Sequence, residues 1–125
     1  DESGCPTLLE LQGAAANRLS HGLCLLESGL ATESLDRFKE SAMIAQLLLH
    51  RYPATTYEYC LLASLHAYCV AAHDLAGDQL SAERQRVSAL EQWKARHRLF
   101  GPAAPYDQMV RNAFAKAGIP LIQEP

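Results

Sequence analysis

Two runs of helical periodicity, each divided by a glycine and each ended by a proline, constrain the fold of this chain most. In the first run Gly29 separates two apolar stripes and Pro53 follows the second stripe. In the second run Gly77 separates the two stripes and Pro102 follows the second. Glycine just beyond a helix and proline shortly after it are the usual signals of helix termination. The pattern predicts a first helix hairpin at about 6–53, a second at about 55–101 and a capping helix at about 105–117.

The spacing of the apolar residues supports an all-α fold. Leucines and alanines recur at steps of three and four residues, and no period-two alternation or hairpin-turn dipeptide competes with them. The stretch 60–75 is apolar on nearly every side, which predicts a helix buried on more than one face. At 125 residues the chain is expected to form a single domain, 1–125, of about five helices, with the fifth packed as a cap across the end of the second hairpin.

Small and bulky side chains alternate along the first hairpin in a way that favours close helix packing. Gly22 is small in the first helix, while Ser34 and Ser41 flank the aromatic Phe38 in the second. Local signals for helix starts follow at Thr32, at the Thr55-x-x-Glu58 capping box and at Asp78.

The two hairpins superpose when the chain is shifted by 48 residues, which brings Gly29 onto Gly77. Ser34 then falls on Ala82 and Ser41 on Ala89. A helix hairpin repeated at fixed spacing is typical of a stacked α-solenoid.

On these residues the chain resembles the tetratricopeptide repeat family from about residue 14 to residue 102. Gly22, Gly29, Ser34, Phe38 and Ser41 stand at the family's small, turn, small, aromatic and small positions. The second hairpin departs from the pattern at Val70 and Arg86, and the repeat is longer than the 34 residues usual in the family.

The resemblance implies a short tetratricopeptide-like solenoid that holds a peptide or helix of a partner protein in a concave groove. Because the implied inner positions are small, apolar and poor in Lys and Arg, they suit an amphipathic helix better than a peptide with a free carboxylate. An alternative is that the same residues form a closed core beneath the fifth helix. The implied groove residues are Ala16, Leu19, Leu23, Leu26, Glu27, Ser64, Ala67, Ala71 and Asp74.

Composition excludes several classes of function. The formal net charge of −3 argues against a dedicated nucleic-acid binder, and no apolar run is long enough to span a bilayer. No basic segment followed by an apolar core and a cleavage site opens the chain, although a targeting signal preceding Asp1 would not be seen. The expected location is intracellular and cytoplasmic.

The four cysteines Cys5, Cys24, Cys60 and Cys69 are expected to be reduced thiols, with a link from Cys24 to the second hairpin as the alternative.

One group of residues could carry chemistry. His66, Cys69 and His73 lie on one face of a single helix, where Cys24 could supply a fourth zinc ligand. The group lacks a CxxC or HExxH pattern, an oxyanion donor and a group to orient a histidine, so a metal site or a Cys–His enzyme is not favoured. We expect no cofactor.

The helix after Asp78 is locally basic, and a solvated face is its expected role, with an acidic protein partner or RNA as the alternatives. Its basic residues are Arg84, Arg86, Lys94, Arg96, His97 and Arg98.

These observations lead to a non-enzymatic protein–protein interaction module, an adaptor or small chaperone. The alternative is a structural helical subunit or scaffold of a larger complex, without a discrete peptide groove. Both allow a homo- or hetero-oligomer.

Overall fold

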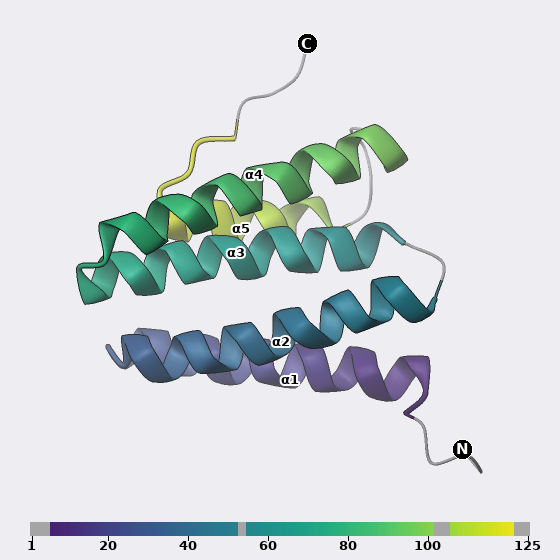
Figure 1. Ribbon diagram of the computed structural model, residues 1–125, viewed down its shortest axis with the longest axis horizontal. Helices are drawn as coiled ribbons and strands as arrows, with labels where there is room; N and C mark the ends of the chain where they lie inside the picture. Colours follow the sequence, from purple (N-terminus) through teal and green to yellow (C-terminus); the bar gives the residue numbers. More distant parts are fainter. Residues whose placement is uncertain (1–5, 53–54, 102–105, 122–125) are drawn as a thin grey trace.

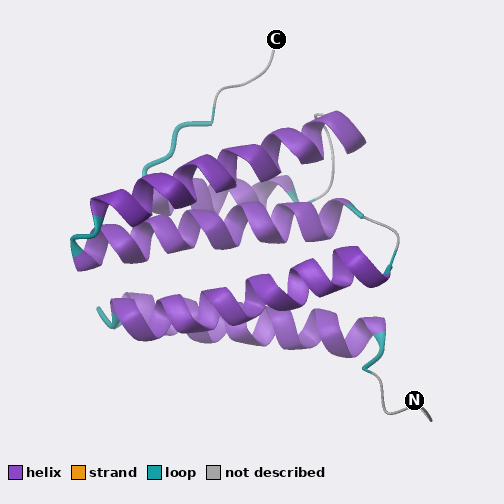
Figure 2. Ribbon diagram, in the orientation of Figure 1, coloured by secondary structure: helices purple, strands orange, loops and turns teal. Residues whose placement is uncertain are grey.

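The computed structural model describes residues 6–52, 55–101 and 106–121, and within these residues it is all-α (Figure 2). The five helices of Figure 1 are α1 (Leu8–Glu27), α2 (Ala31–Arg51), α3 (Thr56–Ala76), α4 (Gln79–Phe100) and α5 (Asp107–Ala117). The predicted helical fold is confirmed. Among these described helices, none is both long enough and apolar enough to cross a membrane.

The helices pack in chain order as antiparallel hairpins. α1 packs on α2, α2 on α3 and α3 on α4, while α5 packs on α3. As Figure 1 shows, α1, α3 and α5 run in one direction and α2 and α4 run in the other. The predicted stack of antiparallel helix hairpins is therefore present.

The close packing of α1 on α2 depends on two small residues, Gly22 and Ser41. A Cβ on Gly22 would lie 2.6 Å from Cε1 of Phe38, so the aromatic ring rests directly on the α1 backbone. One turn further along α2, the buried Ser41 hydroxyl donates a hydrogen bond of 2.7 Å to the Ala15 carbonyl of α1. Two packing positions predicted to be small thus allow the close approach of the helices.

The helix ends agree with the sequence signals in part. Gly29 and Gly77 both adopt φ of +79°, in the left-handed region that glycine enters without steric cost, and so act as the predicted hinges. Asp78 caps α4 by accepting a hydrogen bond from the backbone N–H of Ser81. Thr32 does not cap α2, because that helix already begins at Ala31. Pro53 and Pro102 lie outside the described residues.

Thr55 is the N-cap of α3, as predicted, but its hydroxyl works differently from the expected capping box. Instead of accepting a backbone hydrogen bond, the Thr55 hydroxyl donates one of 2.6 Å to the carboxylate of Glu58. Glu58 is almost completely buried, and this hydrogen bond from Thr55 gives its carboxylate a partner.

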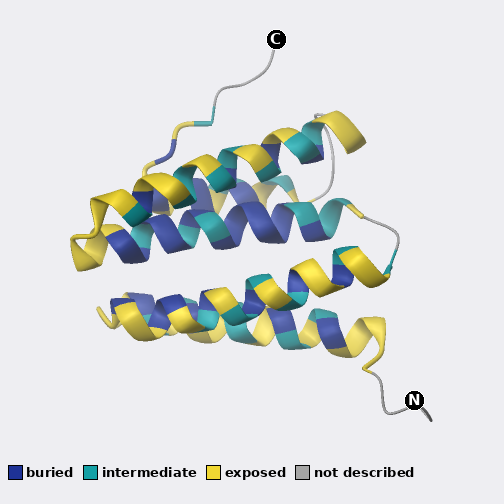
Figure 3. Ribbon diagram, viewed as in Figure 1, coloured by how far each residue is buried: buried dark blue, intermediate teal, exposed yellow. Residues whose placement is uncertain are grey.

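The core consists of two clusters that share α3. One cluster joins α3 to α4 and α5, and the other joins α3 to α1 and α2. Figure 3 shows α3 as the most continuously buried helix. The prediction that this helix is buried on more than one side is confirmed.

The position of α5 differs from the prediction. Tyr106 at the start of α5 contacts Tyr57 at the start of α3, with ring centroids 5.1 Å apart, and Lys116 near its end shares a hollow with Ala71. α5 therefore lies alongside α3 for its whole length and does not cross the end of the second hairpin. Val110, Ala113 and Phe114 pack against the core, which explains this orientation.

Candidate binding groove

The face formed by α1, α3 and α5 is the candidate functional site. In Figure 1 the fainter shading places α1 and α5 on the same, more distant side of the molecule. These two helices do not pack on each other, and α3, which contacts both, forms the floor between them. An ion pair of 3.0 Å between Lys116 Nζ on α5 and Glu27 Oε1 on α1 crosses the groove near one end.

Apolar side chains on this face are held by the core without being fully covered. Leu19 and Leu23 of α1 pack against the cluster between α1, α2 and α3, and both stay half-buried. Met109 of α5 is half-buried and packs against this cluster as well as against the cluster between α3, α4 and α5. Tyr57, Tyr68 and Ala71 supply comparable half-buried surface from α3. An apolar strip thus runs along the inner face from all three helices.

A hollow of about 630 Å³ lies at the end of the groove where α1, α3 and α5 begin. Its apolar walls are Leu9, which is 79% exposed, and the edge-to-face pair of Tyr57 and Tyr106. Burial, with smaller contributions from Glu58 and Tyr106, raises the pKa of the Tyr57 phenol. The remaining lining residues, Gln12, Gly13, Thr55 and Thr56, carry no charge.

A second hollow, of about 400 Å³, lies at the end where the same three helices finish. Leu26, Ala71 and Leu75 form its apolar lining, and Asp74 and Lys116 stand at its rim. Charged side chains therefore line the second hollow and not the first, where the Glu58 carboxylate bonded to Thr55 is buried.

The structure distributes the nine residues implied by the tetratricopeptide resemblance unevenly. Leu19, Leu23 and Ala71 are half-buried on the inner face, Leu26 and Asp74 line the second hollow, and Glu27 forms the ion pair with Lys116. Ala16 is exposed on α1.

Two of the nine residues lie in the core and not at the surface. Ser64 and Ala67 have no exposed surface at all; the Ser64 hydroxyl donates to the Cys60 carbonyl at 2.8 Å, and Ala67 belongs to the cluster with α4 and α5. Because α5 covers this part of α3, neither residue can touch a partner.

Several residues of the groove were missed by the sequence argument. Leu9, Tyr57, Tyr106, Met109 and Lys116 all contribute, and three of them come from α5 and its start. The apolar face of α5 was visible in the sequence, but it was assigned to a cap and not to a groove wall.

The candidate metal or thiol group on α3 does not assemble. His66 Nδ1 lies 2.7 Å from the Gln85 side-chain oxygen, and His73 faces Asp78 at 4.0 Å. Burial raises the pKa of the Cys69 thiol to about 12, which disfavours the thiolate needed for a ligand or nucleophile. Within the described parts of the chain, no three His, Cys, Asp or Glu side chains come close enough to hold a metal ion.

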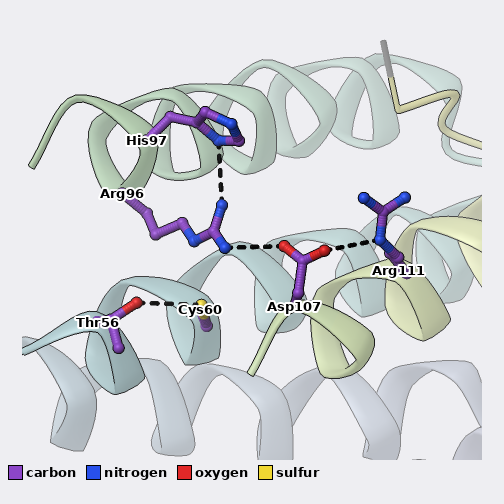
Figure 4. A network of polar contacts seen from close by, with 6 residues as sticks. All are labelled: Thr56, Cys60, Arg96, His97, Asp107 and Arg111. Carbon is purple, nitrogen blue, oxygen red and sulfur yellow. Dashed lines mark hydrogen bonds and ion pairs between the residues drawn. The ribbon is translucent and has the colours of Figure 1, made fainter. Parts of the chain in front are cut away.

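The basic face predicted for α4 needs a correction at Arg96. This residue is fully buried, its guanidinium lies over the Trp93 ring at 4.3 Å, and it donates to Asp107 Oδ1 at 2.8 Å (Figure 4). Arg111 binds the other oxygen of the same carboxylate at 2.8 Å. Arg96 therefore links α4 to the start of α5 through its ion pair with Asp107, and it is not part of a solvated surface.

Cys60 lies beside this network in Figure 4, with its sulfur 3.9 Å from the Thr56 hydroxyl. Burial raises the pKa of Cys60, while the Thr56 hydroxyl and Arg96 act in the opposite direction. Cys24 is exposed, Cys60 and Cys69 are buried, and Cys5 lies outside the described residues.

No protein-family model, no curated protein and no solved structure matches the chain. The tetratricopeptide resemblance consequently stays a prediction, and the site rests on its own geometry.

Proposed function

We propose that this chain is a non-enzymatic protein-interaction module, an adaptor or small chaperone, that holds an apolar or amphipathic helix of a partner protein between α1 and α5. The observation that carries the proposal is the separation of these two helices above a half-buried apolar floor on α3. Apolar surface that is fixed in position but left partly exposed is typical of a protein-binding site.

The kind of occupant follows from the lining of the groove. An extended peptide would leave its backbone N–H and C=O groups facing apolar side chains such as Leu19, Leu23 and Met109, with no sheet edge to pair them. A helix satisfies these groups internally and can present an apolar stripe to the groove. The lining therefore favours a helix.

A tetratricopeptide-like repeat is part of the proposal. Equivalent positions of the two hairpins behave alike: Gly29 and Gly77 share the same φ, and Ser34, Ser41, Ala82 and Ala89 are all completely buried. These parallels support duplication of one hairpin design.

A structural subunit of a larger assembly is the second candidate. The outer helices also expose large apolar side chains, including Met43 on α2, which is 72% exposed, and Leu80 on α4, which is 67% exposed. In that case the binding surface would lie on α2 and α4 and not on the inner face.

A pair of charge-introducing variants separates these candidates. The probe is a synthetic amphipathic helical peptide with a fluorescent label, and binding is measured by anisotropy. Leu23→Glu, on the inner face, should weaken binding at least about tenfold, a loss of about 1.4 kcal/mol. The control Leu80→Glu, on α4, should leave the affinity unchanged.

Far-UV circular dichroism and urea unfolding accompany both variants. If Leu23→Glu unfolds the domain, Leu23 is a core residue and the groove is assigned wrongly. If Leu80→Glu is the variant that loses binding, the outer surface is the interface.

A further inference from the structure

The exposed charged side chains that line the groove lie at one of its ends. Three parallel helices finish at the second hollow, which also holds Asp74 and Lys116 at its rim. Glu27, the last residue of α1, stands beside them through its ion pair with Lys116. Two carboxylates and one ammonium group leave a local charge of −1. The first hollow, by contrast, is lined by uncharged residues.

The two carboxylates occupy positions that work against helix stability. The carboxyl end of a helix bears a partial negative charge, which disfavours acidic and favours basic side chains there. Glu27 is nevertheless the last residue of α1, and Asp74 lies in the last turn of α3, where it is exposed. Among the described residues, Asp74 forms no ion pair with a Lys or Arg. The ion pair with Lys116 accounts for Glu27, but helix stability gives no reason for an acid at Asp74, and a cationic group on a bound partner would.

The parallel direction of the three groove helices adds partial negative charge at the second hollow. Because α1, α3 and α5 are parallel, their three negative ends coincide at the second hollow, and their positive ends coincide at the first. A bound helix is stabilised when its own positive, amino-terminal end lies at the second hollow. That orientation is antiparallel to the three groove helices.

The length of the occupant follows from the separation of the hollows. Leu9 lines the first hollow and Leu26 the second, and Leu26 comes 17 positions after Leu9 along α1, which corresponds to about 25 Å. A helix of about 16 residues with one apolar stripe would reach both hollows.

We propose, resting on the function proposed above, that the partner is an amphipathic helix that lies antiparallel to α1, α3 and α5, with Lys or Arg in its first turn over Asp74. Its apolar stripe contacts Leu19, Leu23 and Met109, and its carboxyl-terminal apolar side chain enters the hollow lined by Leu9, Tyr57 and Tyr106.

Three synthetic peptides test this inference. They share one apolar stripe and about 16 residues, and they differ only in charge: two Lys in the first turn, two Lys in the last turn, or Gln at all of these positions. Lysine near the amino terminus weakens an isolated helix, so a preference for the first peptide cannot come from its own helicity. Binding is measured by fluorescence anisotropy at low and high salt.

We expect the peptide with Lys in its first turn to bind about fivefold tighter than the others at low salt, and this advantage to shrink at high salt, as for an exposed ion pair. Asp74→Lys should abolish the advantage without destabilising α3, because a cation is favourable at that helix end. Lys116→Met should enlarge it by removing the cation at the rim. The matched control is Asp36→Lys on α2, outside the groove, which should leave the advantage intact.

The outcomes distinguish this inference from the proposed function. If all three peptides bind equally and Leu23→Glu abolishes binding of each, the groove stands and the inferred orientation is overturned. If the peptide with Lys in its last turn binds tightest, the orientation is likewise overturned. If none of the peptides binds, the proposed function itself fails. A dimer in sedimentation that Leu23→Glu dissociates and the peptides do not would identify a second copy as the occupant, which also overturns the inference.

Discussion

Gly22 of α1 lies directly against the ring of Phe38 of α2: a Cβ placed on Gly22 would lie 2.6 Å from Cε1 of the ring and 2.7 Å from Cδ1. Phe38 is completely buried and stacks on Tyr68 of α3, with ring centroids 5.7 Å apart, so the ring cannot move away freely. The contact therefore fixes how α1 sits on the rest of the stack, and with it one wall of the groove.

Gly22→Ala should therefore destabilise the protein by about 1–3 kcal/mol, the usual cost of overpacking. Gly13→Ala, in the same helix, is the control, because a Cβ there meets nothing within 4 Å. Removing a glycine from a helix interior should make that variant slightly more stable, by about 0.5–1 kcal/mol. Urea unfolding measures both variants. Equal effects of the two substitutions would contradict the proposed contact.

Because Arg96 is buried, its ion pair with Asp107 should contribute more to stability than the ion pair between Arg111 and Asp107. Asp107→Asn should cost about 3 kcal/mol of unfolding free energy, because the buried guanidinium of Arg96 loses the charge of the carboxylate to which it donates. Arg111→Met removes the other, partly exposed partner of the same carboxylate and should cost less than about 1 kcal/mol. Chemical denaturation at neutral pH gives both values, and a larger loss for Arg111→Met would contradict the role assigned to Arg96.

His73 predicts part of the pH dependence of stability. Burial lowers its pKa below the ordinary 6.5, with a smaller contribution from Lys39 in the same direction, against the opposing effect of Asp78 and Asp74. As the pH falls below about 6.5, the unfolded chain takes up a proton that the folded chain resists, so stability present at higher pH is lost. His73→Gln should lose less stability than the wild type between about pH 7 and pH 5. Identical losses in urea titrations at the two pH values would argue against this role.

The thiols predict a clear order of reactivity. Cys24 is exposed, whereas Cys60 and Cys69 are buried, and the pKa of Cys69 is raised to about 12. In a Cys5→Ser background, one thiol should react rapidly with a disulfide reagent under native conditions and the other two should react slowly until urea is added. Mass spectrometry of the labelled peptides identifies the sites. Fast labelling of Cys69 would show that α3 is accessible on a side where the structure buries it.

Helix positions and close contacts were predictable because they depend on local patterns. The small residues at Gly22 and Ser41, the hinge at Gly29 and the cap at Asp78 each impose a local requirement that a sequence displays directly. These predictions agree with the structure.

The environment of each helix face was harder to predict. Residues 60–75 of α3 are apolar on nearly every side, so periodicity could not tell which residues meet solvent, and Ser64 and Ala67 proved to be buried. Arg96 looked like its basic neighbours on α4, because its burial depends on Asp107 and Trp93, which are brought to it by the tertiary fold. The position of α5 decides both cases, and that position depends on tertiary contacts with α3 and α4 that a local sequence pattern does not display.

The two methionines of the chain allow the most direct test of the groove, because one lies on a groove helix and the other on an outer helix. Met109 of α5 is half-buried against both core clusters, and Met43 of α2 is exposed on an outer helix. With 13C-methyl methionine labelling, assigned through Met43→Leu, a titration with the amphipathic peptide should shift the Met109 signal and leave the Met43 signal in place. A shift of Met43 with Met109 unmoved would contradict the claim that this protein binds its partner between α1 and α5.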